Sequence, residues 1–405
     1  MFELGWDLKA AGLFAILATH FTIAPIELIA QDLDPKLVDY DGSRQIRFIG
    51  SAEAEARRAE MVKFVWPAGL TDSRPNVTAD LGECPELAAV DAELIASVDL
   101  YDVDVGGFDF HSLCYVAHPA SPAPGPSRLA IVHAGHMPDG AENYLAAGLA
   151  EAMNELLRQG YVVAAVQMPL VGWNGDADGT LPSGNTFDIQ PSRSKTGRHD
   201  ELFAKVAEEL DGQTFRFFLE PVVQVTNELL ARNPEHERLL MIGLSGGGWT
   251  THLSAAVDPR IDISIPVAGA LPLYARPFSP GSKGDAEQEY APLFHEEDTN
   301  EDGILDRAAG VASWMEIFAL GGITPDAERP REQVQVLNFF DSCCFSGSVY
   351  LSYEDEVARR VKTISGSAWQ VYVDRSHHDH MISPEVIEDV LRPLAKEGRL
   401  PEVER

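Results

Sequence analysis

The stretch ERLLMIGLSGGG, residues 237–248, decides the fold. Its apolar run LLMI predicts a buried strand, and the WTTHLSAAV that follows predicts a helix. Between them stands a GxSxG pattern in which Ser245 is the serine. Glycines at these positions let the chain turn sharply from strand to helix without a Cβ clash. The turn would expose the Ser245 hydroxyl at its tip, as a nucleophile requires. The alternative is a glycine-rich turn with an incidental serine.

Strands and helices alternate on both sides of this turn. Short apolar runs next to glycine or proline predict strands buried on both faces, and longer amphipathic runs predict helices. The predicted strands are 128–135, 161–169, 261–270, 334–340 and 368–374, and the predicted helices include 142–160, 215–233 and 384–398. This repeated order predicts the α/β class, with a mostly parallel, doubly wound sheet covered by helices on both faces.

A serine nucleophile needs a base and an acid that orients the base. In a strand–turn–helix setting of this kind the chain order is serine, then acid, then histidine. The acid is predicted to be Asp341, which ends LNFFD directly past a strand. The next strand, WQVYVD, runs into the loop SHHDHMISPE, 376–385, which would supply the base.

Three histidines of this loop compete for the role of base. His377 is preferred because it stands four residues beyond Val373, the last apolar residue of the strand, which is a typical reach for such a loop. His380, directly before the closing helix, is the alternative, and His378 is the least favoured. Asp374 is the rival acid, three residues before His377. A metal cluster in HHDH is disfavoured because one short loop rarely supplies a full set of converging ligands.

The oxyanion of an acyl-transfer reaction needs backbone donors next to the nucleophile. The amide of Gly246 is one predicted donor. The second is an amide of the His133-Ala134-Gly135-His136 turn that follows the strand AIV, so Gly135 and His136 are both candidates.

Together these motifs resemble the α/β-hydrolase superfamily over roughly residues 95–400. GLSGGG is similar to its nucleophile elbow, LNFFD to its acid segment with Asn338 where glycine is usual, and SHHDHMISPEVI to its GHxxHxxxPE tail. The resemblance implies Ser245, Asp341 and His377 as the triad, with His380 in a supporting place.

The elbow and the tail also suggest the esterase and oligopeptidase-like branch of this superfamily. About 95 residues before the resemblance are too few for the propeller that oligopeptidases usually carry. A carboxylic ester hydrolase working through an acyl-enzyme is therefore expected, with no required cofactor. The alternatives are an oligopeptidase-like peptidase and a non-catalytic, calcium-stabilised extracellular binding protein of the same fold.

A second motif, DTNEDGILD, occupies residues 298–306. Oxygen side chains at Asp298, Asn300, Asp302 and Asp306, with a turn glycine between them, suit a hard cation and predict a structural Ca²⁺ loop. It is similar to EF-hand, dockerin and thrombospondin type-3 loops. Ala309 stands where the first two carry an acidic ligand. The alternative is a solvated acidic turn.

The composition limits the partners. Lys and Arg number 31 against 63 Asp and Glu, which gives a formal charge of −32, while 45% apolar residues suffice for a large core. This charge disfavours nucleic acid and anionic surfaces as partners. A small-molecule or polymer ester substrate remains. The four cysteines fit neither a disulfide scaffold nor a zinc site, although a Cys84–Cys114 disulfide in an exported protein and a Cys343–Cys344 pair that stiffens the acid loop are both hypotheses.

The domain organisation follows from the same patterns. Residues 1–30 are an apolar segment, 31–94 an N-terminal extension, and 95–400 the hydrolase domain, with an insertion at about 270–333 expected to lie at the pocket mouth. The uncharged run 10–26 has the length of a signal-peptide core or short membrane anchor, which would make the protein exported or membrane-attached. Its flanks lack the usual positive charge, so an apolar helix packed on a cytoplasmic domain is the alternative.

Overall fold

The computed structural model describes residues 33–108, 110–137, 140–175, 178–189, 195–280 and 284–399. The predicted signal or anchor within residues 1–30 lies outside these ranges. In the ranges that are described, no helix is both long enough and apolar enough to span a bilayer.

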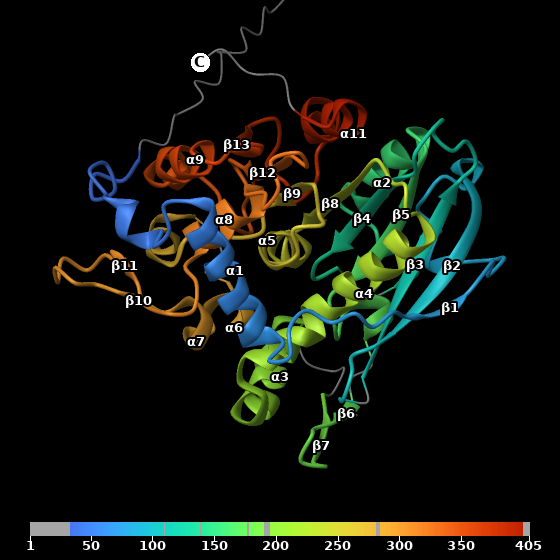
Figure 1. Cartoon of the computed structure of the whole chain (residues 1–405), viewed down its shortest axis with the longest axis horizontal. Helices are drawn as coiled ribbons and strands as arrows, with labels where there is room; N and C mark the ends of the chain where they lie inside the picture. Colours follow the sequence, from blue (N-terminus) through green and yellow to red (C-terminus); the bar gives the residue numbers. More distant parts are fainter. Residues whose placement is uncertain are drawn as a thin grey trace, which may run out of the picture. The chain divides into compact units, whose positions relative to one another are not determined.

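A single twisted sheet holds the strands that the apolar runs predict, in the order β1-β2-β3-β5-β4-β8-β9-β12-β13 (Figure 1). Pairing is antiparallel from β1 to β5 and parallel from β5 to β13, which confirms the mostly parallel sheet. The strands are β1 (Asn76–Thr78), β2 (Ile95–Asp104), β3 (His111–Pro119), β4 (Arg128–Ala134), β5 (Tyr161–Gln167), β8 (Arg238–Leu244), β9 (Ile263–Val267), β12 (Arg331–Asn338) and β13 (Ser367–Asp374).

Helices cover both faces of this sheet (Figure 1). One face packs against α1 (Ser51–Val65), α3 (Lys195–Leu210), α4 (Arg216–Arg232), α5 (Gly246–Val257), α8 (Trp314–Gly322) and α9 (Glu354–Lys362). The other packs against α2 (Leu149–Arg158), α10 (Pro384–Val386) and α11 (Arg392–Glu397), the last two joined by a π-helical turn, Ile387–Leu391. Successive strand residues enter opposite cores, Ile131 the first and Val132 the second. This explains why the central strands are continuously apolar.

The shorter elements lie in the connections. They are β6 (Asp178–Thr180), β7 (Thr186–Asp188), α6 (Ala286–Glu289), α7 (Ala291–Phe294), β10 (Glu296–Glu297) and β11 (Arg307–Ala308). Strands β6 and β7 pair with each other, as do β10 and β11. The ribbon of β6 and β7 is followed along the chain by the start of α3.

The N-terminal extension packs against the sheet domain through a buried arginine. Arg58 of α1 is 4% exposed and donates hydrogen bonds to the carbonyls of Ala256, Leu320 and Ile323. These carbonyls stand at the C-terminal ends of α5 and α8, where the helix itself supplies no donor. Arg331 of β12 donates to the Leu320 and Ile323 carbonyls as well. Arg331 also donates to the Ala255 carbonyl, so the two guanidinium groups together hold the C-terminal end of α5, the helix that follows Ser245.

Candidate active site

Ser245 lies between β8 and α5 in a conformation that few residues adopt. Its φ is 59° and its ψ −122°, and its side chain is partly exposed. A non-glycine residue in this region is strained, so the surrounding packing must enforce it. Its amide donates to the Val267 carbonyl at 2.9 Å, and its carbonyl accepts from the Trp249 amide at 2.9 Å. This is the sharp strand-to-helix turn that the GxSxG pattern predicts.

The turn after β4 lies directly against this elbow. A Cβ on Gly247 would meet the His133 carbonyl oxygen at 2.0 Å, and a Cβ on Gly135 would lie 2.7 Å from the Gly246 nitrogen. Only glycine allows so close an approach. As the first residue of α5, Gly246 has an amide with no partner inside the helix. The structure therefore brings together Gly246, Gly135 and His136, the residues expected to form the oxyanion site.

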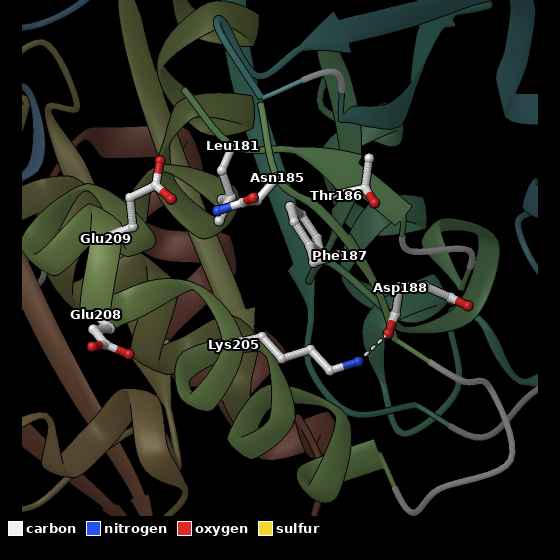
Figure 2. Close-up of a pocket in the computed structure, with 8 residues that line it drawn as sticks. All are labelled: Leu181, Asn185, Thr186, Phe187, Asp188, Lys205, Glu208 and Glu209. Atoms are coloured by element: carbon white, nitrogen blue, oxygen red, sulfur yellow. Dashed lines mark hydrogen bonds between the residues drawn. The ribbon is translucent and has the colours of Figure 1, made fainter. Parts of the chain in front are cut away.

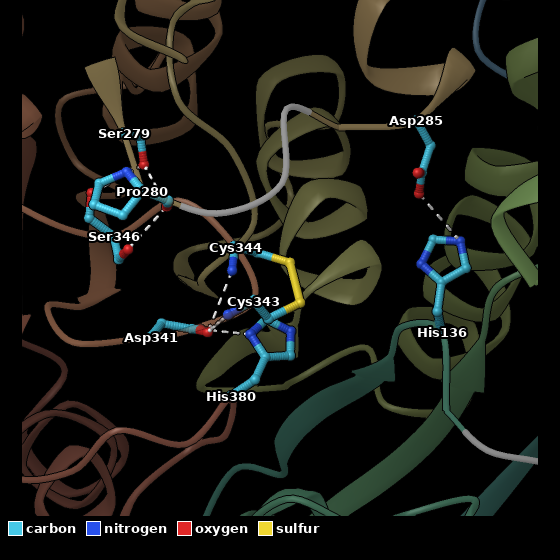
Figure 3. Close-up of a disulfide and its surroundings, with 9 residues drawn as sticks. All are labelled: His136, Ser279, Pro280, Asp285, Asp341, Cys343, Cys344, Ser346 and His380. Carbon is cyan, nitrogen blue, oxygen red and sulfur yellow. Dashed lines mark hydrogen bonds and ion pairs between the residues drawn. A yellow bond between two sulfur atoms is a disulfide. The ribbon is translucent and has the colours of Figure 1, made fainter. Parts of the chain in front are cut away.

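Asp341 follows β12 at the same edge of the sheet and is 2% exposed. Its Oδ2 lies 2.6 Å from Nδ1 of His380, and its Oδ1 accepts from the amides of Cys343 and Cys344 at 2.7 and 3.2 Å (Figure 3). The His380 Nε2 atom is buried and has no hydrogen-bond partner among the described residues. An imidazole held at Nδ1 by a buried carboxylate, with Nε2 left unpaired, has the arrangement of a general base.

The geometry favours His380 over His377, the preferred base from sequence, as the partner of Asp341. His377 folds back on its own strand, with Nε2 3.1 Å from Oδ2 of Asp374, and does not pair with Asp341. His378 stacks on the Phe340 ring at a centroid distance of 4.9 Å. The loop needs the additional residues up to His380 to cross from the end of β13 to the Asp341 side chain, which follows β12. His380, the alternative from sequence, is the histidine that reaches the acid.

Asp374 is surrounded by more donors than Asp341. Its Oδ1 accepts from the Ser376 amide and hydroxyl at 2.8 and 2.7 Å, and its Oδ2 accepts from the Ser383 hydroxyl. Burial acts to raise the Asp374 pKa, but these hydrogen bonds outweigh it and hold the pKa below the ordinary 3.8. Ser383 also caps α10. Asp374 thus holds the 376–383 loop through Ser376, His377 and Ser383 and makes no hydrogen bond with His380.

The cysteines divide into one bonded pair and two free thiols. Cys343 and Cys344 form a vicinal disulfide next to Asp341, as hypothesised (Figure 3). Cys84 and Cys114 are free. They cannot pair because Cys114 belongs to the core on one face of the sheet and Cys84 packs against the core on the other.

The 298–306 loop does not gather its acidic side chains. Asp306 pairs with Arg44 at 3.1 Å, and Asp298 accepts amides of its own turn. In the residues with defined positions, Asp298, Asp302 and Asp306 do not form a group whose oxygens all lie within 4.8 Å of one another. Calcium binding there stays a prediction.

A cluster that the sequence analysis missed lies beside the elbow. His136 and His199 bring their ring nitrogens within 2.9 Å of each other, and Glu287 lies 3.3 Å from His199. Asp285 approaches His136 at 3.6 Å (Figure 3). These four residues, the His136 cluster below, come from three distant segments, so no spacing in the sequence announces them.

An open pocket of about 680 Å³ lies between β7 and α3, away from the triad candidates (Figure 2). Its walls include Phe187 and Leu181, and Lys205 reaches across to the Asp188 carbonyl. None of the residues predicted to be catalytic lines it.

No protein-family model and no curated protein matches this sequence. Solved structures do match. A methylesterase superposes with a TM-score of 0.55 at 16% identity, over 86% of this chain and 64% of that protein. The chain thus spans less than two thirds of the methylesterase. A putative acetyl xylan esterase from Bacteroides fragilis superposes with a TM-score of 0.51 at 13% identity, over 85% of this chain and 81% of that one. With the strand order and the elbow, these likenesses show that the chain has the α/β-hydrolase fold.

Proposed function

We propose that the protein is a serine hydrolase that cleaves carboxylic esters. The observation that carries the proposal is the Asp341–His380 pair, with the buried and unpaired Nε2 of His380 at the sheet edge where Ser245 is held in its strained turn. Parallel strands end at one edge, so the residues that follow β8, β12 and β13 converge there.

In the proposed reaction His380 Nε2 takes the proton of Ser245 as the hydroxyl oxygen attacks the ester carbonyl carbon. Asp341 keeps the proton on Nδ1 and stabilises the imidazolium. The Gly246 amide and an amide of the 135–136 turn hold the oxyanion. His380 then protonates the leaving alcohol. Water attacks the acyl-enzyme with His380 as base again, which releases the acid and restores the serine.

The choice of esters over peptides rests on the similar structures. Both carry esterase names, one for methyl esters and one for acetylated xylan. Methyl and acetyl esters are therefore the first substrates to test, and calcium is proposed at most as a structural ion.

A fluorophosphonate probe tests the serine mechanism directly, because it reacts only with an activated serine. We expect the wild-type protein to be labelled and Ser245→Ala not to be. Ser279→Ala is the matched control, since its hydroxyl bonds to backbone carbonyls near the acid loop and takes no part in the proposed reaction. Equal labelling of Ser245→Ala and wild type would refute the assignment.

A further inference from the structure

The His136 cluster joins three parts of the chain that are far apart in sequence. His136 stands in the turn after β4, His199 on α3, and Glu287 on α6 with Asp285 just before it. Both His199 and Glu287 have side chains that are 0% exposed, while His136 and Asp285 are 14% and 17% exposed. The cluster is therefore buried on one side and reachable from the other.

The hydrogen bonds of His199 fix which of its nitrogens faces the cluster. Its Nε2 lies 2.9 Å from the Pro169 carbonyl oxygen, which can only accept a hydrogen bond, so Nε2 carries a proton. Nδ1 then faces Oε1 of Glu287 at 3.3 Å and Nε2 of His136 at 2.9 Å. In a neutral His199 this Nδ1 is an acceptor that the Nε2–H of His136 can satisfy, but His199 then offers no proton to the Glu287 carboxylate 3.3 Å away, whereas a cation held between the three atoms satisfies all of them.

The acidic side of the cluster shows the same shortage. Oε2 of Glu287 is buried and, among the residues described, has no hydrogen-bond partner. Leaving a buried carboxylate oxygen in this way is costly. The Glu287 carboxylate therefore faces two imidazoles with one oxygen unsatisfied among the described residues.

We propose that the His136 cluster is a binding site for a divalent transition-metal ion, with Zn²⁺ as its best fit. A tetrahedral zinc with bonds of about 2.0–2.1 Å sets neighbouring ligand atoms roughly 3.3 Å apart. His136 Nε2 lies 2.9 Å from His199, 3.6 Å from Asp285 and 3.9 Å from Glu287, and His199 lies 3.3 Å from Glu287. These four distances lie on both sides of the roughly 3.3 Å expected between neighbouring zinc ligands. Imidazole and carboxylate donors suit zinc, and the Pro169 carbonyl is the outer-shell partner that a ligating histidine needs.

The competing occupant is a proton. A doubly protonated His199 would satisfy Glu287 by a buried ion pair, with no metal, and the two cases differ in what the purified protein contains.

The site also bears on catalysis, a consequence that rests on the proposed function. His136 follows Gly135 in the turn beside the elbow, and a Cβ on Gly246 would lie 3.2 Å from Nδ1 of His136. A metal held by Nε2 of the same ring would tie this turn to α3 and α6. It would act as a positioning element for the oxyanion donors, not as a reactant.

The test begins with metal content. The full chain, purified without a metal-binding tag from zinc-supplemented cells, is expected to hold one Zn²⁺ per chain by mass spectrometry of the elements. Stripping with a chelator should lower Tm, and Zn²⁺ alone should restore it. Co²⁺ in the stripped protein should give the visible absorption of a tetrahedral site. A wild-type protein that holds no zinc and binds none in calorimetry overturns the proposal in favour of the proton.

Two variants test whether the metal binds at these residues. Glu287→Gln keeps the shape of the side chain and is expected to weaken Zn²⁺ binding by more than about 100-fold, since even outer-shell changes cost 10–100-fold. His118→Gln is the control, because it removes a histidine–carboxylate pair of 3.0 Å on β3, outside the cluster, and should keep the zinc. Undiminished zinc in Glu287→Gln would place the ion elsewhere and overturn the assignment.

Ser245→Ala separates this proposal from the proposed function. It is expected to keep one zinc per chain while losing esterase turnover. Zinc without turnover in the wild type would refute the function and leave the metal site standing. Turnover without zinc would refute the metal site and leave the proposed function standing.

Discussion

Two histidine–aspartate pairs stand at the ends of neighbouring strands, and they differ in what holds each acid. Asp374 and His377 belong to one turn of chain after β13, whereas Asp341 and His380 come from different segments, 39 residues apart. Asp374 accepts from two serines as well as from His377. Oδ2 of Asp341 pairs with His380, and its Oδ1 accepts hydrogen bonds from the amides of Cys343 and Cys344.

The difference is the basis on which the proposed function gives Asp341 and His380 the catalytic roles and Asp374 and His377 structural ones. Both carboxylate oxygens of Asp374 accept hydrogen bonds from residues of its own loop, so the Asp374–His377 pair stabilises that loop. Through Ser383, Asp374 is also linked to the N-terminal cap of α10. A pair formed across strands leaves a buried nitrogen of His380 available, whereas the ring of His377 is used at both nitrogens: Nε2 faces Asp374 and Nδ1 accepts from the Asp379 amide.

The largest expected effect separates the two histidines. His380→Ala should lower kcat for an aryl acetate by about 10⁴-fold or more, since it removes the proposed base. His377→Ala should lower kcat by less than about tenfold, because its ring only supports the loop. Steady-state kinetics at saturating substrate, with circular dichroism to confirm folding, make the comparison. If His377→Ala proves the more damaging, the assignment of the base is wrong.

Replacing Asp341 should likewise lower kcat more than replacing Asp374. Asp341→Asn keeps the shape of the side chain but favours the wrong tautomer of His380, so kcat should fall by about 10³–10⁴-fold. Thermal unfolding should change less than turnover. Asp374→Asn is the paired control for activity, and a larger loss of kcat there than at Asp341 would exchange the two roles.

Asp374→Asn should act on stability instead. The free energy of unfolding at neutral pH should drop by about 2 kcal/mol, because charge-assisted hydrogen bonds are lost. The folded pKa of Asp374 is lowered, so its contribution is present above the ordinary value of 3.8 and is lost as pH falls through the folded value. The gap between variant and wild type should therefore close in acid. Urea unfolding at several pH values measures it, and a gap that widens in acid would contradict the hydrogen-bond account.

Calcium should have the smallest effect. Binding at the 298–306 loop has to displace Arg44 from Asp306, a contact in which the Arg44 side chain is half-exposed, so the pair contributes little. We expect millimolar Ca²⁺ to shift Tm by at most a few degrees. Arg44→Ala should increase that shift by freeing Asp306, and a shift that disappears in Arg44→Ala would show that the ion binds elsewhere.

The sheet, the elbow and Asp341 could be predicted because each depends on local pattern. Apolar runs set the strands, glycine spacing sets the turn, and Asp341 directly follows its strand. The choice between His377 and His380 could not, because counting residues does not say how a loop folds across to the next strand. The His136 cluster could not be predicted either, because its residues come together only when distant segments fold against each other. The calcium motif stays a prediction, and its spacing alone did not reveal that Asp306 pairs with Arg44 of a distant segment.

The buried Arg58 of α1 has a consequence for how far this protein could be shortened. A fragment beginning at β2 would retain every proposed catalytic residue. It would also expose the apolar face under α1 and leave carbonyls at the ends of α5 and α8 with fewer donors. The minimal unit that carries out the chemistry is therefore larger than the set of residues that perform it, and the shortest autonomous fragment should start ahead of α1.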